Sequence, residues 1–271
     1  LATPAVKAKN WPQKKIDNFI LAKLEAKELE PSPRANARML VQRVYTDLLG
    51  VKPGYEETEA FVADSSPDAF AKLVDRLLAS PQYGERWGRY WLDVARFAED
   101  NPTSESSNPP YPFAWRYRDW VIEAMNQDLP YDRFVKLQLA ADLMPGVPRN
   151  DLPALSYLGS APVYHKDRRL STDVIYTFLT DDWDERVDAV TRGLLGLTVA
   201  CARCHDHKFD PVPTKDYYSL TSVFASTMRA DRPLFDIDPK IEVRYMWVRN
   251  RLFDLRYSID LVLGERHTVD D

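Results

Sequence analysis

Glycine and cysteine are scarce in this chain, which holds 9 Gly and 2 Cys among 271 residues, against 20 Pro. Neither GxGxxG nor GxxxxGK[ST] occurs, so the glycine-rich turns that cradle dinucleotides and nucleotide phosphates are missing. Two cysteines are too few for a disulfide framework. We therefore expect helices that proline begins and ends, rather than a nucleotide-binding or disulfide-stapled fold.

A surplus of positive charge and a long hydrophobic run are also missing. The 36 Lys and Arg are outweighed by 41 Asp and Glu, and the net charge of -5 argues against nucleic acid as a partner. The longest apolar run, residues 193–201, is about half of the roughly 18 residues that a membrane span needs. We therefore expect no membrane span.

Helical periodicity dominates what is present. A hydrophobic content of 45% with seven Trp is enough for a packed core, which excludes disorder along the whole chain. Apolar residues recur at spacings of three and four, and alternating stretches are few, so we predict a mainly α, multi-helix domain with irregular loops. Predicted helices cover residues 14–29, 34–49 and 113–126, and two more start at Pro67 and Pro81, each after a serine.

The second half of the chain is less regular. Residues 145–182 show no clear period, and we predict them to be irregular. Asp184 is the predicted N-cap of a helix whose apolar face includes Val187 and Leu194 and runs on to Cys201. A further helix starts at Thr214, and a long apolar-striped helix is predicted over residues 241–262.

Both cysteines fall in one pentapeptide, Cys201-Ala202-Arg203-Cys204-His205. This C-x-x-C-H spacing is typical of covalent c-type haem attachment. Two thiols three residues apart can form thioethers with the two vinyl groups on one edge of the porphyrin, and the adjacent imidazole can ligate the iron. We therefore predict one covalent haem c held by Cys201 and Cys204, with His205 as the proximal iron ligand.

Two other interpretations of the pentapeptide stay open. A redox disulfide is possible, although a thioredoxin-like site would need a βαβ context that the pattern lacks. A structural zinc ion bound by Cys201, Cys204, His205 and His207 has the right ligand atoms. The usual zinc pattern, however, has two ligand pairs separated by a spacer. The haem interpretation fits the spacing best.

Other residues are candidates for roles around the haem. His165 is a possible distal iron ligand, and Met144 and Met228 are weaker ones because methionine fills cores far more often than it binds iron. An open sixth position would instead favour peroxidase-like or other redox catalysis. Polar residues near such an open site would be Tyr164, Arg168 and Arg169.

Residues within and beside the motif have expected supporting roles. Arg203 is a candidate partner for a haem propionate. His207 is too close in sequence to His205 to reach the opposite face of the ring, so we expect it to hydrogen-bond nearby, with Asp206 or Asp210.

Longer segments resemble the planctomycete cytochrome c-like domain family, a family of secreted proteins of unknown function. The resemblance covers nearly the whole chain and is most specific at the run of residues from Cys201 to Pro211. The other segments that carry it are Trp11-Pro12, Ile16 to Ile20, Arg43 to Gly50, Tyr83 to Trp87, Trp91 to Phe97, Ala114 to Val121 and Tyr217-Tyr218.

The resemblance implies a secreted or periplasmic haem protein that is one module of a larger polypeptide. We expect a single helical domain over residues 1–271, with an N-terminal part to about 145, a haem-bearing part at about 146–230 and a C-terminal helix at about 241–263. The start at Leu1 and the striped helix near the end suggest a fragment that pairs with a C-terminal domain or fragment.

These observations together favour a c-type cytochrome domain that transfers electrons, or the haem module of a larger secreted oxidoreductase. A haem enzyme with an open distal site is one alternative. A surface interaction module with a structural haem or metal is another. Covalent haem attachment takes place outside the cytoplasmic membrane, so we expect the periplasm or the cell surface, with a redox partner protein that the sequence does not identify.

Overall fold

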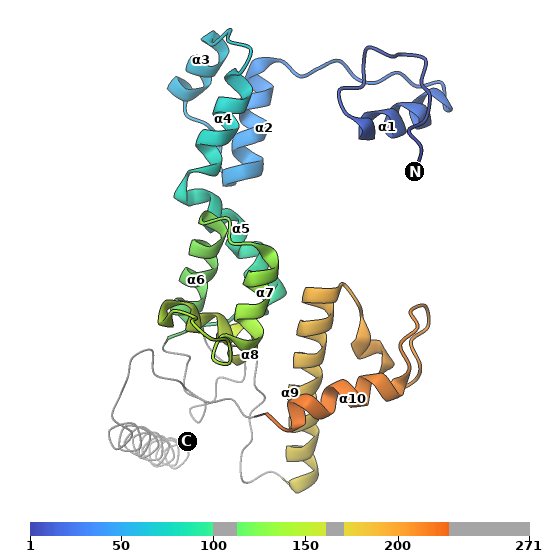
Figure 1. Ribbon diagram of the computed structural model, residues 1–271, viewed down its shortest axis with the longest axis vertical. Coiled ribbons are helices and arrows are strands. Elements are labelled where there is room, and N and C mark those ends of the chain that lie inside the picture. The colour runs from blue at the N-terminus through green and yellow to red at the C-terminus, as the bar shows by residue number, and fades with distance from the viewer. Residues whose placement is uncertain (100–112, 161–170, 228–271) are drawn as a thin grey trace, which may run out of the picture. The chain divides into compact units, whose positions relative to one another are not determined.

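The computed structural model describes residues 1–99, 113–160 and 171–227. Over these residues the chain is helical and contains no strand, which confirms the mainly α prediction (Figure 1). Contacts divide the chain into two compact units, Leu1–Val74 and Asp75–Asp271. The helix predicted at residues 241–262 lies outside the described residues. No helix in the described part has the length and apolar character that a membrane crossing requires.

The first unit contains α1 (Lys15–Glu25), α2 (Ala37–Leu49), α3 (Tyr55–Ala63) and the start of α4 (Ala69–Leu78). α2 begins where the Asn36 side chain accepts a hydrogen bond from the Met39 N–H, and it ends at Gly50, which adopts a left-handed φ of 74°. The Tyr45 hydroxyl donates to Glu57 of α3 at 2.5 Å. Sequence periodicity had not indicated α3, which has no buried residue.

The start of α4 differs from the prediction. The helix begins at Ala69 rather than Pro67, because Ser66 and Pro67 lie in a turn in which the Ala69 N–H donates to the Ser66 carbonyl. Leu73 and Leu77 are buried as the apolar face requires. The next helix, α5 (Pro81–Val94), does begin at its proline, with Ser80 at the N-cap.

The second unit opens with a helical layer around an aromatic core. Its elements are α5, α6 (Ala114–Asn126), α7 (Tyr131–Ala140), the 3₁₀ segment η1 (Arg149–Leu155) and α8 (Ser156–Gly159). The helix predicted over residues 113–126 is α6. Of its apolar residues at spacings of three and four, Tyr117, Trp120, Val121 and Ala124 are buried, whereas Phe113 at the N-cap is 56% exposed. The core also contains Phe134, Leu137 and Tyr157.

α5 meets α6 through glycines instead of large side chains. The Gly84 N–H donates to Asn126 Oδ1 at 2.7 Å, and a Cβ added at Gly84 would lie 2.4 Å from the Ile122 carbonyl oxygen. The large apolar residues of α5 differ in burial. Trp91 packs on the core, whereas Trp87 and Val94 are each 40% exposed.

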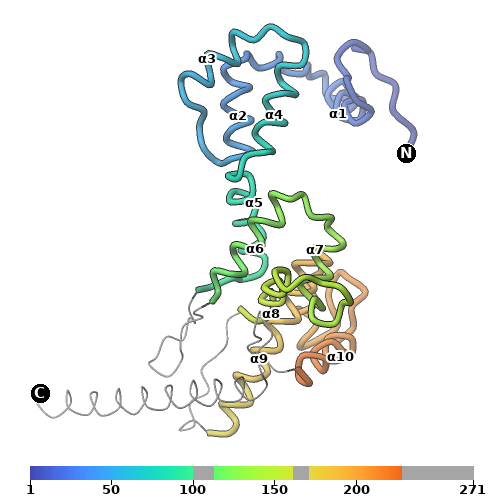
Figure 2. Tube along the Cα trace, turned by 60° about the vertical axis from the view of Figure 1, so that its left-hand side comes forward, coloured from blue at the N-terminus to red at the C-terminus, as the bar shows by residue number. Residues whose placement is uncertain are grey.

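A second layer of this unit holds α9 (Thr172–Val190), the π-helical turn η2 (Thr191–Leu195), the 3₁₀ turn η3 (Val199–Arg203) and α10 (Thr214–Ala225). α9, α10 and η3 contact one another (Figures 1 and 2). Their shared core contains Val187, Val199, Ala202, Tyr217 and Phe224.

The structure corrects three expectations in this region. The described parts of this stretch, 145–160 and 171–182, are largely helical, because they contain η1, α8 and the first 11 residues of α9. Asp184 is not an N-cap but lies inside α9, whose N-cap is Ser171. The helix does not continue to Cys201, because Gly196 takes a left-handed φ of 67° and ends it.

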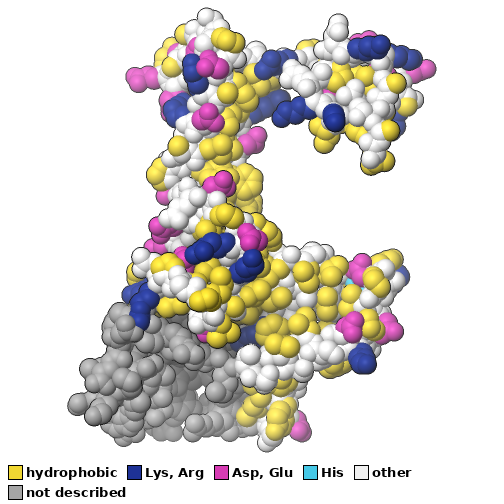
Figure 3. Space-filling model, viewed as in Figure 1, with side chains coloured by type: hydrophobic (Ala, Val, Ile, Leu, Met, Phe, Trp, Pro, Cys, Tyr) yellow, Lys and Arg dark blue, Asp and Glu magenta, His cyan; other side chains and the backbone are white. Residues whose placement is uncertain are grey.

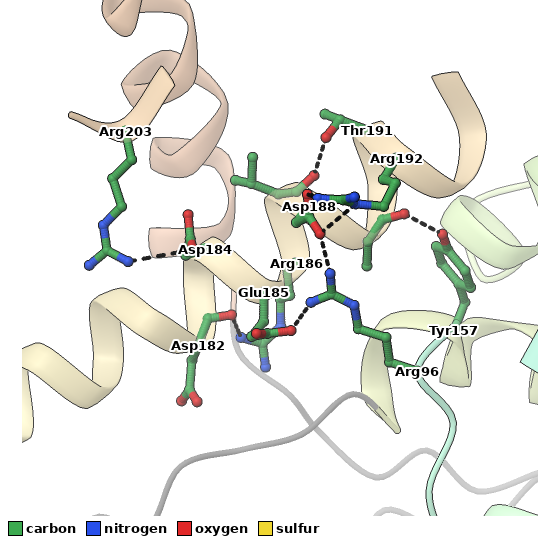
Figure 4. A network of polar contacts seen from close by, with 12 residues as sticks. Arg96, Tyr157, Asp182, Asp184, Glu185, Arg186, Asp188, Thr191, Arg192 and Arg203 are labelled. Carbon is green, nitrogen blue, oxygen red and sulfur yellow. Dashed lines mark hydrogen bonds and ion pairs between the residues drawn. The ribbon is translucent and has the colours of Figure 1, made fainter. Parts of the chain in front are cut away.

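An ion-pair network joins the two layers of the second unit (Figure 4). Arg96 follows α5 in a left-handed conformation, with φ 54°, and its guanidinium pairs with Glu185 and Asp188 of α9. Arg192 binds the same Asp188 carboxylate at 3.0 Å. The Tyr157 hydroxyl donates to the Ala189 carbonyl at 2.7 Å. These contacts hold α9, and with it the following cysteine segment, against the aromatic layer.

Candidate functional site

Cys201 lies in η3 and Cys204 is the residue that ends it. Residues three apart eclipse one another in a 3₁₀ helix, so Val199 and Ala202 share one edge and Cys201 and Cys204 lie near another. Val199 and Ala202 are buried against α9 and α10, whereas both cysteines are exposed free thiols. The turn therefore directs its small apolar residues into the core and leaves both sulfur atoms accessible.

His205 directly follows this turn and is exposed. Its Nδ1 lies 2.8 Å from the backbone oxygen of Asp206. A carbonyl oxygen only accepts, so this contact places the ring hydrogen on Nδ1 and leaves a lone pair on Nε2. No hydrogen bond with another described residue occupies Nε2. His205 thus has the tautomer in which a metal-ligating imidazole binds through Nε2 while Nδ1 is held by a backbone acceptor.

His207 has a different, enclosed environment. Its side chain is 6% exposed, and Nδ1 accepts from the backbone N–H of Asp210 at 2.8 Å and of Phe209 at 3.3 Å. Since those backbone groups only donate, the ring hydrogen lies on Nε2, which donates to Thr198 Oγ1 at 2.9 Å. Both ring nitrogens are occupied, so His207 ties the segment after the cysteines back to the residue before η3.

The two aspartates of the motif are used in different ways. Asp206 Oδ1 accepts from the N–H of Thr214, the first residue of α10, at 2.8 Å. The Asp210 carboxylate is 40% exposed and lies 3.5 Å from His207 Nδ1. The Asp206 contact ties the loop after η3 to the first residue of α10.

Arg203 points away from the thiols, toward α9. Its Nη1 lies 3.0 Å from Asp181 Oδ1. The same nitrogen lies 3.5 Å from Asp184 Oδ2 (Figure 4). Burial by itself would lower the pKa of Arg203, but the hydrogen bond to Asp181 and the neighbouring carboxylates outweigh burial and raise it. The role of Arg203 toward a haem propionate stays a prediction.

No role at the site was predicted from the sequence for four residues that contact it. Thr198 binds His207, Asp181 and Asp184 bind Arg203, and Tyr217 donates to Asp184 Oδ1 at 2.5 Å. The acidic run on α9 was visible in the sequence, but its partners come from a segment about 20 residues away. Only the packing of η3 on α9 in the folded structure shows that these aspartates contact Arg203.

The remaining haem-ligand candidates are not brought to the motif by the described residues. His165, Tyr164, Arg168, Arg169 and Met228 lie outside them. Met144 is partly buried and packs on the aromatic core of the first layer. This placement fits the core-filling role that methionine commonly has.

Three features of the described residues bear on the zinc and disulfide interpretations. Within residues 1–99, 113–160 and 171–227, no group of three or more His, Cys, Asp or Glu is arranged to hold a metal ion. His207, the fourth ligand of the zinc interpretation, has both nitrogens occupied. A thioredoxin-like disulfide site needs a neighbouring strand, and none occurs in the described part of the chain.

Residues 15–229 match a family model whose description is PSCyt2, protein of unknown function (DUF1549). The chain belongs to this family. The matched range runs from α1 to just beyond α10 and includes the whole of the cysteine motif. No curated protein and no solved structure matches the chain. The site therefore has to be interpreted from its own geometry.

Hydrophobic side chains also remain exposed on the described surface (Figure 3). Beside the motif these include Phe209, which is 83% exposed, and Tyr218, which is 55% exposed. The Tyr218 hydroxyl donates to the Arg203 carbonyl at 3.2 Å, so this ring lies next to η3. An exposed aromatic ring beside two exposed thiols and an imidazole is a surface that suits a flat, largely apolar ligand.

Proposed function

We propose that this protein is a c-type cytochrome domain that binds one haem covalently through Cys201 and Cys204, with His205 as the iron ligand. The observation that carries the proposal is the outward edge of η3. There two free thiols three residues apart are exposed beside an imidazole that keeps an unoccupied Nε2. This donor set fits the two vinyl groups and the iron of one haem.

The attachment chemistry suits exposed, unpaired thiols. Each cysteine sulfur would form a bond to one vinyl carbon, and the thiol hydrogen would go to the other carbon of the same vinyl group. The addition needs no oxidant or reductant, so the protein has to supply only two reduced thiols at the correct spacing. The eclipsed positions on η3 support that spacing.

His205 supplies the iron ligand because its ring is already oriented. The hydrogen bond from Nδ1 to the Asp206 oxygen holds the ring in one tautomer and increases the electron donation of Nε2. Asp206 is itself restrained through its side chain, which binds the first N–H of α10. When bound, the haem supplies one-electron redox chemistry.

We infer electron transfer as the function, in a domain of a secreted oxidoreductase located in the periplasm or at the cell surface. Covalent haem attachment in bacteria takes place outside the cytoplasmic membrane, which supports that location. The ligand on the other face of the iron decides between electron transfer and catalysis at an open position.

Intact mass and a pyridine haemochrome assay test the proposal. The full chain is expressed with a periplasmic leader in a host that attaches haem c, and the mass should exceed that of the polypeptide by one haem. Cys201→Ala and Cys204→Ala should each leave one thioether and shift the haemochrome band, and the double variant should lose covalent haem. Ser219→Ala, a matched small substitution on α10, should retain it. A mass equal to that of the bare polypeptide would refute the proposal.

Spectra of the same sample determine the sixth ligand. A sharp α-band in the reduced state and a low-spin ferric spectrum support a six-coordinate electron carrier. A high-spin ferric spectrum that changes on addition of cyanide would contradict electron transfer as the function and favour catalysis at an open iron.

A further inference from the structure

The residues between the two cysteines face the opposite way from the thiols. Ala202 is fully buried, and Arg203 extends along the buried side toward α9 with its side chain 34% exposed. Arg203 is therefore partly buried and held by α9, next to the thiols and His205 in the chain.

A small charge cluster surrounds the Arg203 guanidinium. It consists of that guanidinium and the carboxylates of Asp181, at 3.0 Å, and Asp184, at 3.5 Å. Figure 4 shows the pair of Arg203 and Asp184. The Tyr217 hydroxyl donates a hydrogen bond to Asp184. Burial is the largest cause that raises the pKa of Tyr217 and this hydrogen bond is the second, so its phenol stays neutral. With one cation and two carboxylates, the Arg203 cluster carries a net charge of minus one at neutral pH.

The Arg203 cluster also holds the motif in place. The guanidinium binds α9, and the Arg203 backbone oxygen accepts from Tyr218 of α10 at 3.2 Å. A residue two positions before His205 is thus fixed to both neighbouring helices. The net negative charge is consequently held at a constant position relative to the imidazole.

We propose that Arg203 is a positioning residue whose cluster with Asp181 and Asp184 biases the iron bound at His205 toward the ferric state. This inference rests on the proposed function. The physical reason is that a nearby negative charge stabilises the more positive oxidation state, and partial burial limits screening by solvent. Arg203 offsets part of that effect, so changes at the arginine and at the aspartates should act in opposite directions.

Reduction potentials of the full-length holoprotein test this. Asp181→Asn removes a negative charge and should favour the ferrous state at least threefold. Arg203→Gln removes the positive charge and should favour the ferric state by a similar factor. Threefold corresponds to about 28 mV at 59 mV per tenfold change for one electron. Arg203→Lys keeps the charge and should restore a potential close to that of the wild type.

The control changes the same charge elsewhere. Asp132→Asn on α7 removes a carboxylate that is 71% exposed and paired with Lys136, and it should leave the potential unchanged. Raising the ionic strength should reduce the shifts at Asp181 and Arg203. A purely structural role would instead move both variants in the same direction, through greater exposure of the haem.

The outcomes separate the two proposals. A wild-type chain without covalent haem overturns the proposed function. Covalent haem with unshifted potentials, or with shifts of the same sign for Asp181→Asn and Arg203→Gln, overturns only the role of the Arg203 cluster. If Arg203→Gln does not fold, Asp181→Asn and Asp184→Asn decide, because both must favour the ferrous state.

Discussion

The enclosed histidine of the motif provides the sharpest test of the site geometry. His207 makes hydrogen bonds of 2.8 Å to the Asp210 N–H and 2.9 Å to Thr198 Oγ1, with its side chain only 6% exposed. Each such bond contributes about 1 kcal/mol net, and a partner left unpaired in a partly buried site adds a further cost. We expect His207→Ala to lower the free energy of unfolding by about 2 to 3 kcal/mol.

The measurement is denaturant unfolding followed by circular dichroism, on the apoprotein so that haem does not contribute. Lys208→Ala is the matched control, since this exposed neighbour contacts only the Phe209 ring among the described residues, and it should change stability by less than about 0.5 kcal/mol. A double-mutant cycle with Thr198→Val should give a coupling energy of about 1 kcal/mol. A loss below about 0.5 kcal/mol for His207→Ala, or no coupling to Thr198, would refute the arrangement.

Two further predictions concern the second unit. Gly84→Ala should destabilise it by about 1 to 3 kcal/mol in thermal unfolding, because the new Cβ would meet the Ile122 backbone oxygen. Gly88→Ala should cost less, because its added Cβ comes no closer than 3.2 Å to the Ile122 side chain and 3.6 Å to backbone; equal losses would contradict the close crossing. Burial raises the pKa of Tyr157 to about 12, so the stability that its protonated phenol contributes is complete below pH 10 and is lost as the pH rises toward 12. Tyr157→Phe should lower the free energy of unfolding by about 1 kcal/mol at pH 7, because it removes the hydrogen bond to the Ala189 carbonyl. Above pH 10 the stability of this variant should fall less steeply with pH than that of the wild type, and an equal slope would count against the prediction.

Local signals predicted several elements well. The left-handed glycine at residue 50 marked the end of α2, and the apolar stripe of α6 marked a helix whose Tyr117 and Trp120 are buried. Both signals depend on short-range backbone preferences and on burial of one helix face. Such preferences act within a few turns of helix, so the sequence contains them in readable form.

Other elements depended on distant contacts. The middle of α9 contains many acidic residues, so its apolar period is weak and the sequence did not predict its full length. Asp188 is buried there because it pairs with Arg96 and Arg192, which come from other parts of the chain or from the next turn. The end of the helix at Gly196 was not apparent from the sequence either, because the apolar residues before and after this glycine all pack on the core. A helical period alone does not reveal a π turn that keeps the same residues buried.

The amino-acid sequence by itself determined the helical class and the five residues of the motif, because periodicity and spacing are properties of the chain. Tertiary structure decided which atoms of that motif are available. Packing of η3 against α9 and α10 turned Ala202 and Arg203 inward and left Cys201, Cys204 and Nε2 of His205 accessible. The roles of the two neighbouring histidines were likewise separated only by their surroundings. His205 is exposed and bonded to a carbonyl, whereas His207 accepts from backbone N–H groups of its own turn and binds the Thr198 hydroxyl from the other side of η3.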